Sequence, residues 1–149
     1  MKFQATAITA VAALLSLSSA ASIPTQSLRK NAVSSDLTKR ESNDYCGDSS
    51  FENQTSGGSP LVSDCQQIIT NIAGGGDWSL GMFQRKIAEH GTCAFGAQVD
   101  GTVSKVGNQD VIDLIQASID QFQWNGLVGA QGEMNCGYIY DVRWAIYHN

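Results

Sequence analysis

Two histidines are the candidates for acid–base chemistry in this sequence. His90 follows Glu89, and His148 is the penultimate residue, five positions after Arg143. Small secreted acidic ribonucleases use His, Glu and Arg together, so these four residues define the enzyme alternative. No matching motif surrounds them, and the sequence lacks a Gly-x-Ser-x-Gly turn, a His-Glu-x-x-His zinc motif and an acidic calcium loop. The sequence therefore indicates no catalytic residue, no metal site and no cofactor, and it predicts a non-enzymatic protein.

Two further sets of residues could carry chemistry, and neither has the required pattern. Asp100 and Asp110 could converge as an acid–base pair, but nothing in their spacing favours it. The glycines at 74–76 lack the Lys-Ser/Thr ending of a phosphate-binding loop and fit the end of a helix better.

The cysteines carry the clearest structural information. An even number of cysteines in a small secreted domain is typical of a disulfide framework, here two bonds among Cys46, Cys65, Cys93 and Cys136. The intervening gaps of 18, 27 and 42 residues do not match zinc-ligand spacing. Three pairings are possible. We favour Cys46–Cys93 with Cys65–Cys136, although spacing alone leaves the others open.

The N-terminal part of the chain predicts secretion. Residues 1–20 combine a charged start, an apolar stretch and small residues, as in a signal peptide. Residues 21–40 form a polar segment that ends in the dibasic pair Lys39-Arg40, which we interpret as a propeptide with its cleavage site. The alternatives are a membrane anchor and a chance basic pair in a disordered arm. Residues 41–149 then form one secreted, extracellular domain without a transmembrane segment.

Removal of the first forty residues changes the charge of the protein. The whole chain has 9 basic and 14 acidic residues, but five of the basic ones and only one acid precede residue 41. Residues 41–149 keep four basic and thirteen acidic residues, a net charge of −9. Such a surface repels phosphate backbones and anionic membranes, so nucleic acid is excluded as a partner.

The periodicity of apolar residues predicts two helices. Ser59 caps the first, Pro60 takes its first position, and it ends at residues 74–76. The second begins with Asn108 as its cap and ends at Asn125-Gly126.

Alternating apolar residues predict strands between and after the helices. Residues 93–99 form a strand with one buried face, and a C-terminal strand begins near Asn135, after a glycine-rich loop that runs to Gly132. Residues 78–87 fit either a short helix or a strand. The fold class is therefore α+β, a small disulfide-stapled antiparallel sheet with two helices packed on it.

Several surface features follow from the same patterns. Asn53 begins an Asn-Gln-Thr glycosylation site in a polar segment, so we expect a glycan there. Asp141 and Arg143 should form a surface ion pair. Trp124 and Tyr147 are candidates for a binding surface, although burial in the core is the favoured interpretation for both.

Five blocks of residues resemble, in order, a family of secreted fungal effectors related to the necrosis-inducing extracellular protein two of a leaf-mould pathogen. The match covers nearly all of residues 45–147 and all four cysteines, and only residues 79–86 do not align. The blocks are Cys46-Gly-Asp-Ser-Ser-Phe-Glu-Asn53, Ser59-Pro-Leu-Val-Ser-Asp-Cys65, Gly91-Thr-Cys-Ala-Phe-Gly96, Val106-Gly-Asn-Gln-Asp-Val111 and Gly132-Glu-Met-Asn-Cys136.

The resemblance implies a toxin-like effector that induces necrosis by binding an extracellular host receptor or a cell-wall component. It transfers the four cysteines as disulfide partners and no catalytic residue. It also implies kinship with killer toxins, so antagonism of other microbes is the first alternative. A small secreted hydrolase and a non-toxic wall protein remain the others.

Overall fold

The computed structural model describes residues 42–101, 103–137 and 139–149. The predicted signal peptide, propeptide and cleavage site at Lys39-Arg40 lie outside these residues. None of the described helices is long and apolar enough to cross a membrane. The elements, in chain order, are β1 (Glu52–Asn53), α1 (Val62–Ile72), β2 (Asp77–Leu80), β3 (Arg85–His90), β4 (Cys93–Val99), β5 (Ser104–Gly107), α2 (Asn108–Phe122), β6 (Ala130–Met134) and β7 (Val142–His148).

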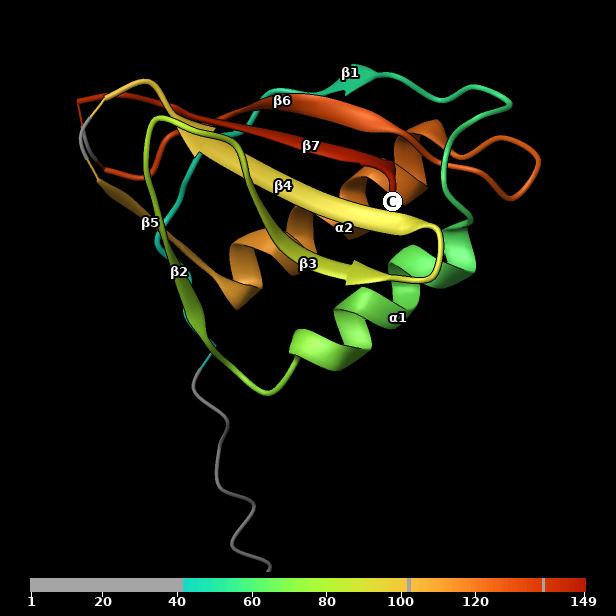
Figure 1. Cartoon of the computed structure of the whole chain (residues 1–149), viewed down its shortest axis with the longest axis horizontal. Coiled ribbons are helices and arrows are strands. Elements are labelled where there is room, and N and C mark those ends of the chain that lie inside the picture. Colours follow the sequence, from blue (N-terminus) through green and yellow to red (C-terminus); the bar gives the residue numbers. More distant parts are fainter. Residues whose placement is uncertain (1–41, 102, 138) are drawn as a thin grey trace, which may run out of the picture. The chain divides into compact units, whose positions relative to one another are not determined.

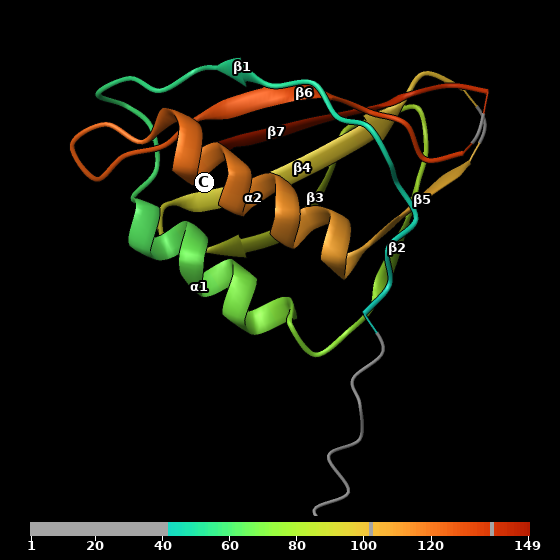
Figure 2. The same cartoon turned by 180° about the vertical axis from the view of Figure 1, so that it is seen from behind.

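The strands form a five-stranded antiparallel sheet and a two-stranded one. The larger sheet has the order β1-β6-β7-β4-β3, and β2 pairs with β5 in the smaller one. Both helices cover the same face of the larger sheet, and the opposite face is open to solvent (Figures 1 and 2). The predicted α+β class, with two helices on a small disulfide-stapled antiparallel sheet, is confirmed.

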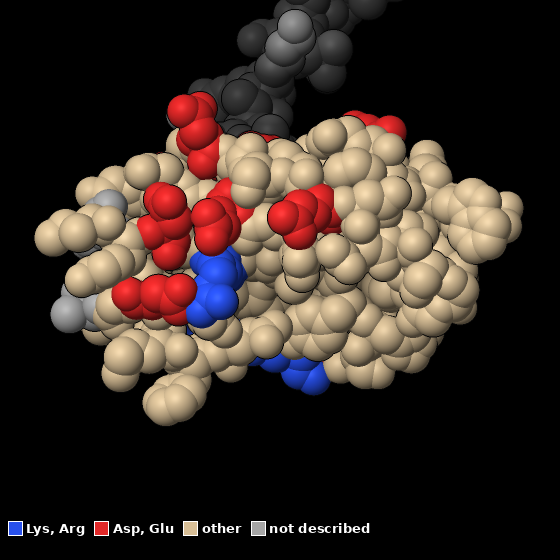
Figure 3. Space-filling model, turned by 90° about the horizontal axis from the view of Figure 1, so that it is seen from above, with Lys and Arg blue, Asp and Glu red and all other residues tan. Residues whose placement is uncertain are grey.

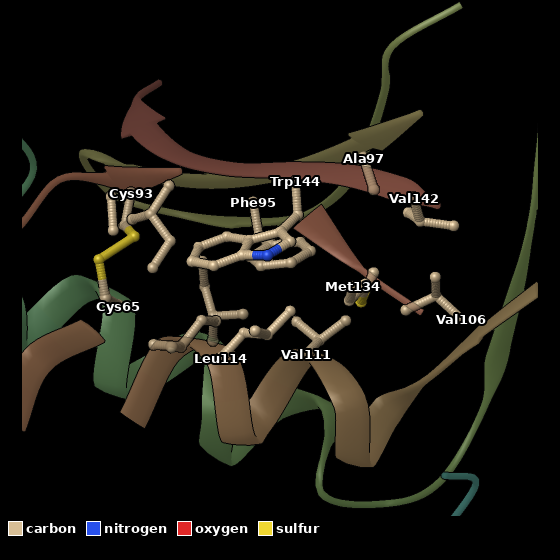
Figure 4. Packing of buried hydrophobic residues seen from close by; sticks show 14 of the residues in the cluster. Cys65, Cys93, Phe95, Ala97, Val106, Val111, Leu114, Met134, Val142 and Trp144 are labelled. Atoms are coloured by element: carbon tan, nitrogen blue, oxygen red, sulfur yellow. A yellow bond between two sulfur atoms is a disulfide. The ribbon is translucent and has the colours of Figure 1, made fainter. Parts of the chain in front are cut away.

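The hydrophobic core lies between the helices and the larger sheet. Phe95 of β4 stacks on Trp144 of β7 with ring centroids 6.1 Å apart, and Leu114 of α2 packs below them (Figure 4). Phe51 meets the same Trp144 edge-on at 5.2 Å, which brings the segment before β1 into the core. These large aromatic contacts fix the distance between the layers.

Strand β4 has the predicted bounds, but the prediction of one buried face is wrong. Its core side carries Phe95 and Ala97, as expected, yet Ala94 and Gly96 on the open side are also buried. They are buried because β4 lies between β7 and β3 and because the Tyr147 side chain covers Gly96. A Cβ atom on Gly96 would come within 3.0 Å of the Tyr147 ring.

Several predicted boundaries are wrong, among them the end of α2, which lies at Phe122 and not at Asn125-Gly126. Leu61, and not Ser59, is the cap residue of α1, because the Ser59 hydroxyl bonds with the backbone of Ser56 and Gln54. Gly107 caps α2 in place of Asn108, which is its first residue. The predicted C-terminal strand begins at Val142, later than expected.

The predicted glycine-rich loop contains strand β6. Gly132 lies within this strand, and a Cβ atom there would be 2.0 Å from the backbone oxygen of Ser50. The lack of a side chain at Gly132 therefore lets the backbone before β1 lie close to β6. The glycine does not indicate a loop. The open alternative at 78–87 is resolved in favour of strands β2 and β3.

The disulfide pairing expected from the sequence is wrong. The structure joins Cys46 to Cys136 and Cys65 to Cys93, and all four cysteines are bonded. The reason is topological, because α1 packs against the turn that starts β4, and the N-terminal arm runs beside the end of β6. The spacing of the cysteines along the chain does not show which of these segments become neighbours in the fold.

A network of hydrogen bonds surrounds the Cys65–Cys93 bond. The Asp64 carboxylate accepts hydrogen bonds from the backbone N–H and the hydroxyl of Thr92, at 2.8 and 2.7 Å. The Leu61 N–H donates to the same Thr92 hydroxyl, and the Asn149 N–H donates to the Thr92 carbonyl. Gly91 beside it has a φ of +52°, and a Cβ atom there would be 2.5 Å from the Asp64 carboxylate. Helix α1, the β3–β4 turn and the C-terminus thus meet at Thr92.

We predict that Asp64 makes the stability of the fold dependent on acid. The two hydrogen bonds from Thr92 lower the pKa of the Asp64 carboxyl, with the neighbouring His90 adding a smaller effect in the same direction. The stability contributed by the carboxylate is therefore present above about pH 4 and is lost as the pH falls through the lowered pKa. Asp64→Asn should unfold at lower urea concentration than the wild type at pH 7, and this difference should shrink towards pH 2.

Asp120→Asn is the matched control, because Asp120 is exposed on α2 and accepts a hydrogen bond from Gln116 of its own helix. A difference between Asp64→Asn and the wild type that stays constant from pH 7 to pH 2 would contradict the prediction.

Candidate functional site

The open face of the larger sheet contains a groove of about 400 Å³. Its floor is made of two small residues that pair with each other, Gly96 of β4 and Ala145 of β7. Longer side chains stand two positions along the same strands, Gln98 on β4 and Arg143 on β7, because alternate residues of a strand share one face of the sheet. The groove is therefore a product of residue size along two adjacent strands, β4 and β7.

The walls of the groove are polar. Gln98 of β4, Gln131 of β6 and Gln84 of the β2–β3 loop line it, and each amide can both donate and accept hydrogen bonds. The Gln131 amide donates to the Glu52 carboxylate at 2.8 Å, which ties β1 to β6 at this edge. The groove thus presents several hydrogen-bonding groups on a rigid surface.

Charged groups line one side of the groove. Glu133 of β6 lies opposite Arg143 of β7 in the strand register. Both residues line the groove together with Glu52. Arg143 forms an ion pair with Asp100, so the predicted pair between Arg143 and Asp141 is wrong. Asp100 follows β4, and the β4–β7 register brings it next to Arg143. Figure 3 shows acidic side chains gathered around a basic one near one end of the surface seen from above.

The groove suits recognition of a polar ligand. Carboxylates and amides bind hydroxyl and amide groups, while the excess of acid over base disfavours anionic ligands. Within the described residues, no group of three His, Cys, Asp or Glu side chains lies close enough together to hold a metal ion. The arrangement provides binding groups for a ligand that is neutral or positively charged.

The four residues considered for ribonuclease chemistry do not form one cluster. His90 and His148 lie on strands that flank β4, each in register with Cys93. Arg143 lies near the opposite end of β7, and Glu89 forms an ion pair with Lys86.

Asp100 and Asp110 have separate partners. Asp110 is buried and accepts hydrogen bonds from the backbone N–H groups of Tyr45, Cys46 and Gly107 at 2.7–3.1 Å. Burial raises the pKa of the Asp110 carboxyl, and these backbone hydrogen bonds partly offset that effect. Asp110 therefore holds the N-terminal arm against the start of α2, and no acid–base pair with Asp100 is formed.

The structure separates the two aromatic candidates for a binding surface. Trp124 is 57% exposed, so its expected burial is wrong, but it lies in the loop after α2, away from the groove. Tyr147 is half-buried on the open face, against Gly96 in the floor of the groove. The alternation of β7 predicts the face that Tyr147 occupies. The sequence does not point to the glutamines of the groove, because the strand register that brings them together is not visible in it.

Asn53 lies at the exposed edge of the sheet in β1. Its side-chain oxygen accepts a hydrogen bond from the Thr55 N–H at 2.8 Å, and the residue is exposed. A glycan on Asn53 stays a prediction.

Comparison with known proteins shows which family this chain matches. Residues 45–136 match the family model Hce2, described as "Pathogen effector; putative necrosis-inducing factor". A probable chitinase of Penicillium expansum, LysM18, is 39% identical over 111 residues, and the secreted chitinase LysM12 of the same organism is 33% identical over 118 residues. These matches cover 68% and 69% of this chain but only 8% of each relative.

The family match includes all four cysteines and every element from the N-terminal arm to the end of β6. It therefore spans both disulfides and most of the groove, and it agrees with the resemblance found in the sequence. The chain belongs to the Hce2 family of pathogen effectors.

Proposed function

We propose that this protein is a secreted, non-enzymatic effector that provokes plant cell necrosis by binding an extracellular target. The family match over residues 45–136 is the observation that carries this proposal. Cleavage after Lys39-Arg40 would release the domain that contains both disulfides. A disulfide-stapled domain keeps its fold outside the cell, where an oxidising environment preserves such bonds.

The open groove supports binding as the mode of action. It lies on a rigid sheet, its walls offer amides and carboxylates, and a half-buried tyrosine borders its floor. Hydroxyl-rich polymers and glycosylated receptors present complementary groups, because each hydroxyl can donate to a carboxylate and accept from an amide. A cell-wall component or a host receptor glycan is thus the class of target that the groove favours.

The named relatives favour a second candidate, antagonism of other microbes. Both are named chitinases, and the segment that matches this chain is a small part of each. An effector domain that accompanies chitinases would act at chitin-containing walls. In that case the wall polymer of a competing microbe would occupy the groove, and the plant cell would not be the target.

We predict that the oxidised protein causes ion leakage when infiltrated into leaves. The test uses protein secreted by cells that express the full chain, with reduced and alkylated protein as its control. Reduction removes both disulfides, each of which stabilises a small domain by about 2–4 kcal/mol, so the control should be unfolded and inactive. Leakage is measured as the conductivity of leaf-disc bathing solution.

Absence of leakage in several plant species, together with inhibited growth of a chitin-walled microbe, would contradict the first candidate and support the second.

We also predict that the groove is needed for activity. Gln98→Ala combined with Gln131→Ala should raise the protein concentration that gives half-maximal leakage by about tenfold, because two lost hydrogen bonds amount to about 1.4 kcal/mol. The matched control is Gln66→Ala with Gln121→Ala, which removes two exposed glutamines from the helices. Equal loss of activity in both variants, or no loss in the groove variant, would show that the target binds elsewhere.

A further inference from the structure

Five large apolar side chains are exposed at one end of the larger sheet. We call them the apolar tip, and they come from three loops. The β2–β3 loop gives Met82 and Phe83, 66% and 85% exposed; the β4–β5 loop gives Val103, 63%; the β6–β7 loop gives Ile139 and Tyr140, 93% and 47%.

The strand registers bring these loops together. Arg85 at the start of β3 pairs with Ala97 near the end of β4, and Val99 at that end pairs with Val142 at the start of β7. Leu80 and Ser104 pair in the smaller sheet, so the β2–β3 and β4–β5 loops also leave from one place. Both ribbon views show the loops at the same end of the molecule (Figures 1 and 2).

Direct contacts fasten the loops to one another. The Val99 N–H donates to the Gly81 carbonyl at 3.1 Å, which joins the β2–β3 loop to the end of β4. The Tyr140 ring lies so close to Gly101 that a Cβ atom there would be 2.2 Å from it. Asp100 in the β4–β5 loop forms the ion pair with Arg143 of β7. The tip is therefore presented by a braced set of loops.

Exposing these five apolar side chains to water costs free energy, and a role in solution alone does not explain why they are exposed together. Exposed apolar side chains are ordinary when scattered, but contiguous groups mark interaction surfaces. Here Phe83 and Ile139 protrude from the loops with 85% and 93% of their surface in water. Protruding side chains suit insertion into a soft apolar phase, whereas protein interfaces are built on surfaces that pack closely against a partner.

The charges at the base of the tip identify the phase. Arg85 directly follows the β2–β3 loop, Arg143 is the second residue of β7, and Asp100 and Asp141 lie within the loops, so both signs of charge are present at the base. A zwitterionic headgroup carries a phosphate and an ammonium group, which match this mixed ring of charge. An anionic membrane would be repelled by residues 41–149, whose net charge is −9. Tyr140, half-exposed at the base, is of a residue type enriched at membrane interfaces.

We propose that the apolar tip inserts into the surface of a zwitterionic lipid bilayer. Phe83, Ile139 and Met82 enter the boundary between headgroups and acyl chains, about 5–10 Å deep, and the arginine–aspartate base stays at the headgroups. The tip adjoins the groove on the open face, because Arg143 belongs to both, but insertion of the tip does not depend on the identity of the groove's ligand.

Flotation with phosphatidylcholine vesicles tests the proposal, again with protein secreted from the full chain. The wild type should float with the vesicles, with similar affinity in about 0.1 M and 0.5 M NaCl, because apolar insertion is not screened by salt. Phe83→Ser with Ile139→Ser should lower the affinity at least tenfold. Both side chains are highly exposed, so the variant should melt at the wild-type temperature.

Trp124→Ser is the matched control, because it removes an exposed apolar side chain from the loop between α2 and β6, at the other end of the sheet. It should bind vesicles as the wild type does. Failure of the folded wild type to float, binding to anionic vesicles alone, or equal loss in Trp124→Ser would each overturn the proposal. If the wild type does not float while Phe83→Ser with Ile139→Ser loses leaf activity, the tip docks a protein and not lipid.

Discussion

The bond between Cys65 and Cys93 holds helix α1 against the central part of the larger sheet. It joins α1 to the first residue of β4, the strand with the most buried residues of the sheet. Because β4 lies between β3 and β7, fixing its position also fixes the two strands that carry Arg85, Lys86 and Arg143. Asp64 and Thr92 strengthen the same junction with hydrogen bonds. The Cys46–Cys136 bond then ties the N-terminal arm to the end of β6 and closes the domain.

The two faces of the larger sheet have different roles as a result. The helices cover one face and bury Phe95 and Trp144 beneath them. The other face is left free for a groove floored by Gly96 and Ala145, whose lack of bulk creates the hollow. The fold thus provides a rigid polar surface, and at one end of the sheet the loops between its strands form an apolar surface. A protein with two such surfaces can contact a polar polymer and a lipid layer at once.

The sequence predicts the parts of this fold that depend on local patterns. The apolar periodicity of α1 and α2 predicts these helices, because each buries one stripe of its own residues. The alternation of β4 predicts the bounds of that strand, although both of its faces are buried. The sequence does not predict β6, because Gly132 is of a residue type typical of loops and its contact with Ser50 is visible only in the structure. The disulfide pairing and the ion pair of Arg143 are also missed, because both depend on which strands become neighbours. The groove is missed for the same reason, since its glutamines lie far apart along the chain and only the strand register brings them together.

Disulfide mapping shows whether Cys65 joins α1 to β4. Proteolysis of the secreted, non-reduced protein, followed by mass spectrometry of the linked peptides, identifies which cysteines are joined. The structure predicts one peptide pair that links Cys46 to Cys136 and another that links Cys65 to Cys93. A bond between Cys65 and Cys136 would contradict it, because α1 would then be detached from β4 and neither the groove nor the apolar tip would be held as described.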